Sequence, residues 1–207
     1  MFVSYDTYNE KTKQYYVIRS YLEHLEEIGG GTLTLEAGTY HITNSLYVLS
    51  NVTIILKDGA TIAKSDDTGL ADFPFATPIF ILAAPSRSKT ENAYGGYDGE
   101  SNIRILGEGN AVMDLNYVLD AIGIVLGHNQ NVTISGITFR NMYSGHFIEM
   151  DASKNVIIEN NTFKDHKAYA SEYKEAINVD TPDATTGGFN HIWSNHDCTP
   201  NKDIFIR

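Results

Sequence analysis

The segment Asn131-Val-Thr-Ile-Ser135 decides the fold, because runs of the same design begin at Asn51, Asn102, Asn155 and Asp203. Each run starts with Asn or Asp and places apolar residues at alternate positions, which is typical of a short β-strand with one buried side. The starts are separated by one or two coils of ~24 residues with insertions, a period typical of a solenoid. We therefore predict an all-β right-handed parallel β-helix, with the Asn residues in left-handed turns between strands.

An antiparallel β-sandwich would also give short strands at regular spacing. Its strands would lie in different environments and would not need to resemble one another. Each coil of a solenoid instead repeats the environment of the previous coil and stacks like residues in ladders. The similarity among the runs therefore favours the solenoid.

One amphipathic helix precedes the strands. Its apolar positions are Val17, Ile18, Tyr21, Leu22, Leu25 and Ile28. The glycines at 29–31 end the helix. We predict an N-terminal segment, residues 1–28, whose helix caps the solenoid, and a β-helix over residues 29–207. We expect that β-helix to be incomplete at its C-terminal end, because the sequence ends inside a strand-like run.

The composition is that of a soluble globular protein, with 42% apolar and 20% charged residues in a chain of 207. The formal net charge of -11 disfavours nucleic acid and anionic membrane surfaces as partners. Cys198 is the single cysteine, so no intrachain disulfide forms. The sequence contains no membrane-span candidate and no signal peptide, so any export signal is expected outside it. The oligomeric state stays open.

The run Gly29-Gly-Gly-Thr-Leu-Thr-Leu-Glu-Ala-Gly-Thr-Tyr40 closely resembles the opening of pectate-lyase-like β-helix proteins. The coils that begin at Asn131 and Asn155 resemble the internal coils of the same superfamily. The resemblance covers about residues 29–207 and implies an extracellular or cell-surface location. The superfamily contains polysaccharide lyases, glycoside hydrolases, epimerases, phage tailspikes and adhesins, so the fold alone does not give the activity.

A narrower resemblance is to polygalacturonase-type glycoside hydrolases, whose pattern after Asn-Thr-Asp is Gly-Ile-Asp-x-Asp-Ser. The matching segment is Lys174-Glu-Ala-Ile-Asn-Val-Asp-Thr181. Glu175, Asn178 and Asp180 take the places of the three aspartates, so one acid has become an amide. The Gly-His-Gly motif of that family has no good match in this sequence.

Aligning the coils on Asn131 and Asn155 places Ile124 beside Ile148 and Leu126 beside Met150, with Ile177 and Val179 continuing the stack. The outward positions then form three ladders. They are Ile122 with His146 and Glu175, Val125 with Glu149 and Asn178, and Gly127 with Asp151 and Asp180. Neighbouring coils lie ~4.8 Å apart, so Asp151 is expected to face Asp180.

Paired carboxylates suit glycoside hydrolysis, which needs an acid and a second carboxylate. We predict Asp180 as the general acid, Asp151 or Glu175 as its partner, and His146 as a group that tunes their protonation. The alternative is a solvated sheet face on which acids stack by chance.

The same carboxylates suggest a second chemistry. Asp151, Glu175 and Asp180 offer the hard oxygens that calcium prefers. A calcium-assisted lyase would use Lys174 or Lys167 as the base. No other cofactor is expected.

Two loops by composition, residues 84–100 and 181–201, are expected to project from the coils and to carry binding. The predicted substrate-binding residues are Glu149, Asn178, Lys174, Tyr94, Tyr97, Trp193 and His191. The aromatic residues would give faces for sugar rings. Alternatively, they pin the loops to the solenoid.

The leading prediction is a carbohydrate-active protein that hydrolyses an extracellular polysaccharide. The alternatives are a non-catalytic polysaccharide binder or a cell-surface or phage adhesin, a lyase, and a structural spacer. An open cleft containing Asp151 and Asp180 would favour the enzyme. Burial of either residue would remove the predicted site.

Overall fold

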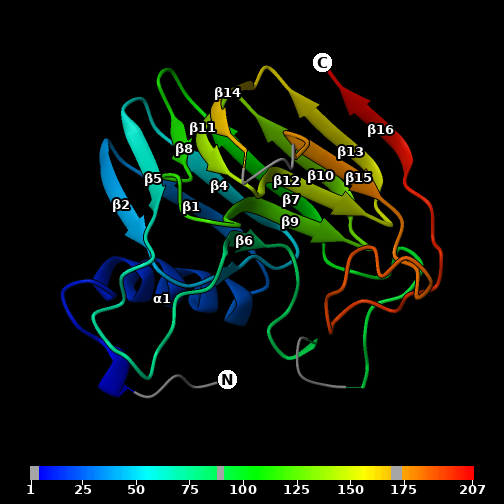
Figure 1. The fold of residues 1–207 in the computed structure, drawn as a ribbon, viewed down its shortest axis with the longest axis horizontal. Coiled ribbons are helices and arrows are strands. Elements are labelled where there is room, and N and C mark those ends of the chain that lie inside the picture. The colour runs from blue at the N-terminus through cyan, green and yellow to red at the C-terminus, as the bar shows by residue number, and fades with distance from the viewer. Residues whose placement is uncertain (1–4, 88–90, 169–173) are drawn as a thin grey trace.

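Three parallel sheets form the walls of a right-handed β-helix in the computed structural model (Figure 1). The structure describes residues 5–87, 91–168 and 174–207. Sheet A contains β1 (Gly31–Leu35), β4 (Val52–Leu56), β7 (Ser101–Gly107), β10 (Gln130–Ser135), β13 (Lys154–Glu159) and β16 (Lys202–Ile206). Sheet B contains β2 (Gly38–Ile42), β5 (Ala60–Lys64), β8 (Val112–Asp114), β11 (Thr138–Tyr143) and β14 (Thr162–Lys167). Sheet C contains β3 (Leu46–Tyr47), β6 (Pro78–Ile81), β9 (Ile122–Gly127), β12 (His146–Asp151) and β15 (Ile177–Asp180).

The recurring Asn runs all belong to sheet A, which confirms the prediction made from them. The five starting residues adopt positive φ angles. These are Asn51 at 64°, Asn102 at 58°, Asn131 at 57°, Asn155 at 55° and Asp203 at 56°. Asn and Asp tolerate this left-handed conformation better than most side chains, so their recurrence marks the turn that enters each strand.

The interior of the solenoid is built from the alternate apolar positions of the strands. Val132 and Ile134 of β10 are buried, while Thr133 between them points outward. The same alternation in β7 and β13 aligns like side chains, because β10 pairs with both strands in register. Stacking these residues along the axis produces one continuous hydrophobic core.

The helix α1 (Lys13–Glu27) covers the end of the coil stack that begins with β1, β2 and β3 (Figure 1), and the short 3-10 helix η1 (Tyr5–Thr7) precedes it. Its buried residues Tyr15, Ile18, Leu22 and Leu25 belong to the same core as the strands. Burying an apolar side chain of this size contributes ~1.5–3 kcal/mol, so the helix shields an end of the core that water would otherwise reach. No helix in the described part of the chain has the length and apolar character needed to span a membrane.

Two details of the predicted packing are wrong. The apolar pattern predicts that Val17, Tyr21 and Ile28 face the core, but they are 45%, 57% and 61% exposed. The buried side of the helix includes Tyr15 instead. Val179 has the predicted register beside Met150 but is 49% exposed. Its strand β15 is the outermost strand of sheet C among the described residues, so no further strand covers it.

Candidate functional site

The register of sheet C brings two of the predicted outward ladders together. Asp151 of β12 lies beside Gly127 of β9 and Asp180 of β15. The second ladder forms in the same way and contains Val125, Glu149 and Asn178. Aligning the coils on their Asn starts therefore gave the correct register for this sheet.

The third ladder forms only in part. His146 pairs with Ile122, but Glu175 precedes β15 and takes no part in the strand pairing. His146 Nδ1 instead lies 2.8 Å from the Glu175 carbonyl oxygen and 3.9 Å from its carboxylate. Glu175 and the neighbouring Lys174 are exposed.

The 181–201 loop folds over the outward side of sheet C. Its Phe189 and Trp193 are 4% and 2% exposed, and their rings meet edge to face at 5.1 Å. Both rings lie against Gly127, where a Cβ would clash with Phe189 and lie 3.2 Å from Trp193. The absence of a side chain at Gly127 therefore makes room for the two aromatic rings that hold the loop down.

The two long loops are tied to each other. The Tyr94 N–H donates to the Trp193 carbonyl at 2.8 Å, and the Asn195 N–H donates to the Tyr94 carbonyl at 2.8 Å. The Tyr94 hydroxyl donates to Glu100 Oε1 at 2.6 Å within the 84–100 loop. Residues 88–90 of that loop lie outside the described residues. The loops thus form one cover over sheet C.

His128, which sequence reasoning did not single out, connects this cover to the solenoid. It is buried directly after β9, with Nδ1 2.9 Å from the Gly96 carbonyl oxygen and Nε2 2.8 Å from Ser194 Oγ. A carbonyl oxygen only accepts, so the contact with Gly96 requires a proton on Nδ1. The positive φ of 61° at His128 resembles that of the Asn turns, but a single His has no periodic signal.

The cover changes the electrostatics of the carboxylates beneath it. Asp151 is fully buried, and neither of its carboxylate oxygens has a hydrogen-bond partner in the described part of the chain. Burial, reinforced by the nearby charges of Glu149 and Asp180, raises the pKa of Asp151 to about 8. Glu149 Oε2 lies 3.5 Å from His191 Nε2, and the His191 ring stacks on Trp193 at 5.0 Å.

The prediction that Asp151 lines an open groove is wrong. Its register is as expected, but the carboxylate is fully buried, and it lies beside Gly127, against which the aromatic rings of the 181–201 loop pack. Asp180 is exposed at the margin of the cover, where its Oδ1 accepts from the Thr181 N–H at 2.8 Å. Of the two neighbouring acids that hydrolysis would need on one substrate, only Asp180 is therefore accessible to solvent.

The predicted sugar-binding aromatics serve mostly to pack the loops. Tyr94 and Trp193 are 2% exposed, so neither presents a ring face to solvent. Tyr97 is partly exposed, and its hydroxyl donates to the Pro200 carbonyl at 2.8 Å, which joins the two loops again. His191 is partly buried against Trp193 and Glu149. The alternative, in which aromatics pin the loops to the solenoid, applies to Tyr94 and Trp193.

The suggested calcium ligands do not form a ligand set. Within residues 5–87, 91–168 and 174–207, no three His, Cys, Asp or Glu side chains are placed to hold a metal ion together. Asp151 is enclosed, whereas Glu175 and Asp180 are exposed.

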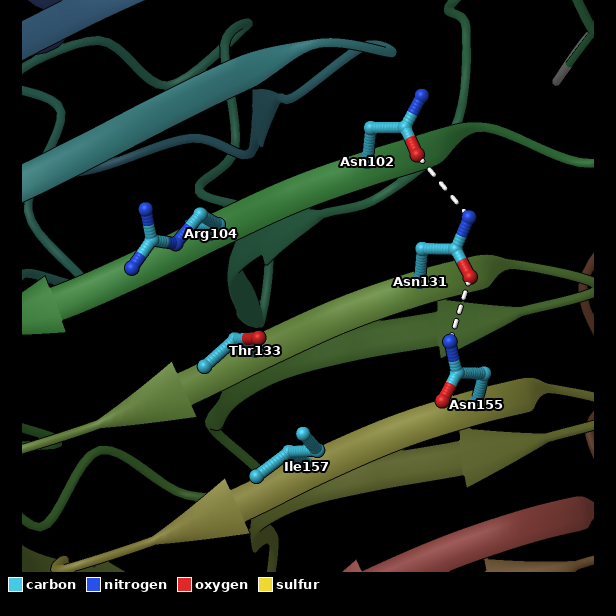
Figure 2. A pocket seen from close by; sticks show the side chains of 6 residues that line it. All are labelled: Asn102, Arg104, Asn131, Thr133, Asn155 and Ile157. Atoms are coloured by element: carbon cyan, nitrogen blue, oxygen red, sulfur yellow. Dashed lines mark hydrogen bonds between the residues drawn. The ribbon is translucent and has the colours of Figure 1, made fainter.

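A different surface remains open. The outward side of sheet A carries a shallow groove with a volume of about 270 Å³ (Figure 2). It is lined by Asn102, Arg104, Asn131, Thr133, Asn155 and Ile157. The recurrence of Asn predicts the left-handed turns at these residues, but it does not predict the groove, which arises from the open space above three neighbouring strands.

No protein-family model matches the chain. Among curated proteins, plasmin and fibronectin-binding protein A of Streptococcus pneumoniae is 29% identical over 142 residues, which cover 66% of this chain and 20% of that protein. The chain thus corresponds to about a fifth of this curated relative.

Solved structures give a consistent picture of the fold. A crystal structure of PfbA, a surface adhesin of Streptococcus pneumoniae, matches 91% of this chain and 43% of its own with a TM-score of 0.72 and 21% identity. A second PfbA structure gives a TM-score of 0.70, with 21% identity over 91% of this chain and 47% of its own. A galactohydrolase named for galactose-4-sulfate and 3,6-anhydro-galactose-2-sulfate matches 97% of this chain and 47% of its own at 16% identity, with a TM-score of 0.51. The chain is a right-handed parallel β-helix with the fold of the PfbA adhesin.

Proposed function

We propose that this chain is a non-catalytic binding module of a cell-surface adhesin. The observation that carries the proposal is the full burial of Asp151, beside the Gly127 position where the 181–201 loop packs, which leaves one member of the predicted acid pair without access to a substrate. A scaffold whose carboxylate face is closed while another sheet face stays open is suited to binding rather than to hydrolysis. The polypeptide that closes the face is anchored by two buried aromatic side chains.

The similarity to plasmin and fibronectin-binding protein A supports the same proposal. The similar stretch covers two thirds of this chain, and both PfbA structures share its fold. The name of that protein gives plasmin and fibronectin as its ligands, so we propose the same two proteins as ligands for the present chain. The function also implies a location outside the cell.

A binding assay paired with an activity assay tests the proposal. Plasmin and fibronectin are immobilised in separate channels, and binding of the chain is followed optically. The same preparation is incubated with uronate and neutral polysaccharides, and new reducing ends and unsaturated products are recorded. We expect saturable binding to at least one protein and no product from any polysaccharide.

The Asp180→Asn variant is the matched control, because Asp180 is the exposed acid of the predicted catalytic pair. An adhesin predicts unchanged binding in this variant. Release of reducing ends by the unmodified chain, lost in Asp180→Asn, would show that the module is a hydrolase instead.

Glycoside hydrolysis of the polygalacturonase type is the second candidate. One observation favours it: the raised pKa of Asp151 keeps a protonated carboxyl beside Asp180 near neutral pH, as a general acid requires. This function needs the 181–201 loop to lift from sheet C. Reducing ends released by a Phe189→Ala variant, but not by Phe189→Ala combined with Asp151→Asn, would support it. No product from either variant would exclude it for the polysaccharides tested.

A further inference from the structure

The open face of sheet A presents two rows of side chains that cross β7, β10 and β13 (Figure 2). The first row consists of the amides of Asn102, Asn131 and Asn155. The second row consists of Arg104, Thr133 and Ile157, which lie beside one another in the strand register. Successive members of each row are separated by the strand spacing of ~4.8 Å.

The amide row is held in place by its own hydrogen bonds. Asn131 Nδ2 donates to Asn102 Oδ1 at 3.0 Å, and Asn155 Nδ2 donates to Asn131 Oδ1 at 2.7 Å (Figure 2). An amide has two N–H donors and two acceptor lone pairs, so Asn131 retains one of each for a ligand. A sugar hydroxyl both donates and accepts, and a row of fixed amides offers it partners with little further loss of side-chain entropy.

Arg104 gives the groove a positive charge in an acidic protein. It is exposed, and it makes no hydrogen bond or ion pair with another described residue. Lys57 and Arg207, at the ends of other runs in sheet A, are instead paired with Glu108 and Glu159. None of the described residues that line the groove is a carboxylate, although the chain has a formal net charge of -11. The guanidinium is therefore available for a planar anion such as a carboxylate.

The second row ends in apolar side chains. Ile157 lines the groove, and Phe205 of β16 lies beside it in the register with 56% of its surface exposed. An aromatic ring next to an aliphatic side chain offers a surface for the C–H face of a sugar ring. The face therefore combines amides, one unpaired cation and an apolar patch within a few strands.

We propose that this face of sheet A binds a glycan that carries a carboxylated sugar, with the carboxylate at Arg104 and the chain crossing the strands. The proposal rests on the proposed adhesin function and assigns that function a surface and a ligand chemistry. An extended peptide fits this surface less well. Strand addition requires a free sheet edge, whereas β7, β10 and β13 are each paired on both sides.

Ligand-observed NMR titrations with three soluble probes test the proposal. Sialyllactose presents a terminal carboxylated sugar, a hyaluronan tetrasaccharide presents internal ones, and lactose is the neutral control. We expect at least one acidic probe to bind about tenfold more tightly than lactose, because a charge-assisted hydrogen bond is lost with the neutral sugar. Comparison of the two acidic probes separates a terminal acidic sugar from an internal one.

The Arg104→Gln variant should weaken binding of that acidic probe about tenfold, whereas Lys57→Gln should change it less than about twofold. Both substitutions remove one positive charge from a solvent-accessible side chain, and unchanged unfolding midpoints verify folding. Equal binding of acidic probes and lactose, or equal effects of the two variants, would overturn the proposal. If the chain still binds fibronectin or plasmin in that event, the adhesin function stands and the assigned surface is wrong.

A final arm separates glycan from polypeptide recognition. For whichever protein is bound, enzymatic removal of its glycans should abolish binding of the unmodified chain. Binding retained after deglycosylation would identify the polypeptide as the ligand and would contradict the proposal.

Discussion

The outward faces of sheets A and C are built by the same alternation of strand residues but differ in what lies above them. Sheet A leaves its Asn and Arg104 side chains accessible in a shallow groove. Sheet C lies under a cover made by the 84–100 and 181–201 loops, and Asp151 is fully buried there. An outward position in a solenoid is therefore accessible only where no connection folds back across it.

The two faces also treat polar groups differently. The amides on sheet A hydrogen-bond to one another and remain exposed. Asp151 on sheet C has lost water without gaining a hydrogen-bond partner among the described residues, which is costly for a charged carboxylate. Aromatic packing therefore stabilises the closed face, while ionisation of the buried Asp151 destabilises it. The amides of the open face carry no charge and have no such cost.

Removing the aromatic anchor of the cover should reduce the free energy of unfolding more than any other change considered for the two faces. Trp193→Ala deletes a ring that packs against Phe189 and Tyr94, and we expect the free energy of unfolding to fall by ~3–5 kcal/mol. Urea unfolding measures the loss, and hydrogen exchange should show faster exchange in residues 181–201. The control is Ile192→Ala, whose side chain is 70% exposed and should matter by less than ~0.5 kcal/mol. Comparable losses in both variants would mean that Trp193 does not anchor the cover.

The second prediction concerns the charge beneath the cover. The pKa of Asp151 is raised to about 8 from 3.8, so between these values the folded state binds a proton that the unfolded state has lost. The contribution of Asp151 to the free energy of unfolding is therefore largest at low pH. It declines as pH rises from about 4 to about 8, by at most ~1.4 kcal/mol per pH unit. Asp151→Asn should remove this decline and gain ~2–3 kcal/mol near pH 8, less than the full sum because proteins relax around buried charges.

Urea unfolding at a series of pH values measures this difference, with Lys64→Met as the matched control. Lys64 is also buried, but burial lowers its pKa to about 7, so its contribution varies only above that pH and rises with it. The control should leave the slope between about pH 4 and about pH 7 unchanged. An unchanged slope in Asp151→Asn would show that Asp151 is not the group responsible.

The comparison also shows what the sequence could predict. The left-handed turns at Asn131 and its equivalents and the register of Asp151 follow from periodic patterns, because each coil repeats the same environment. The burial of Asp151 depends on Phe189 and Trp193 reaching Gly127, a contact between distant segments that has no period. Composition identified the loop but could not tell whether it projects or folds back.

The smallest expected effect lies on the open face, where the amide ladder can be broken at its middle. Asn131→Gly removes both hydrogen bonds of the Asn131 amide but suits the φ of 57°, so we expect a loss of ~1 kcal/mol in unfolding free energy. Asn131→Ala should lose ~1 kcal/mol more, because a Cβ is disfavoured in the left-handed region. Thr133→Val, two residues away on the same strand, keeps both the turn and the ladder and should change stability by less than ~0.5 kcal/mol. Urea unfolding of the three variants gives the order. An alanine variant as stable as the glycine variant would show that the backbone of this turn relaxes, and that Asn recurs here for its amide alone.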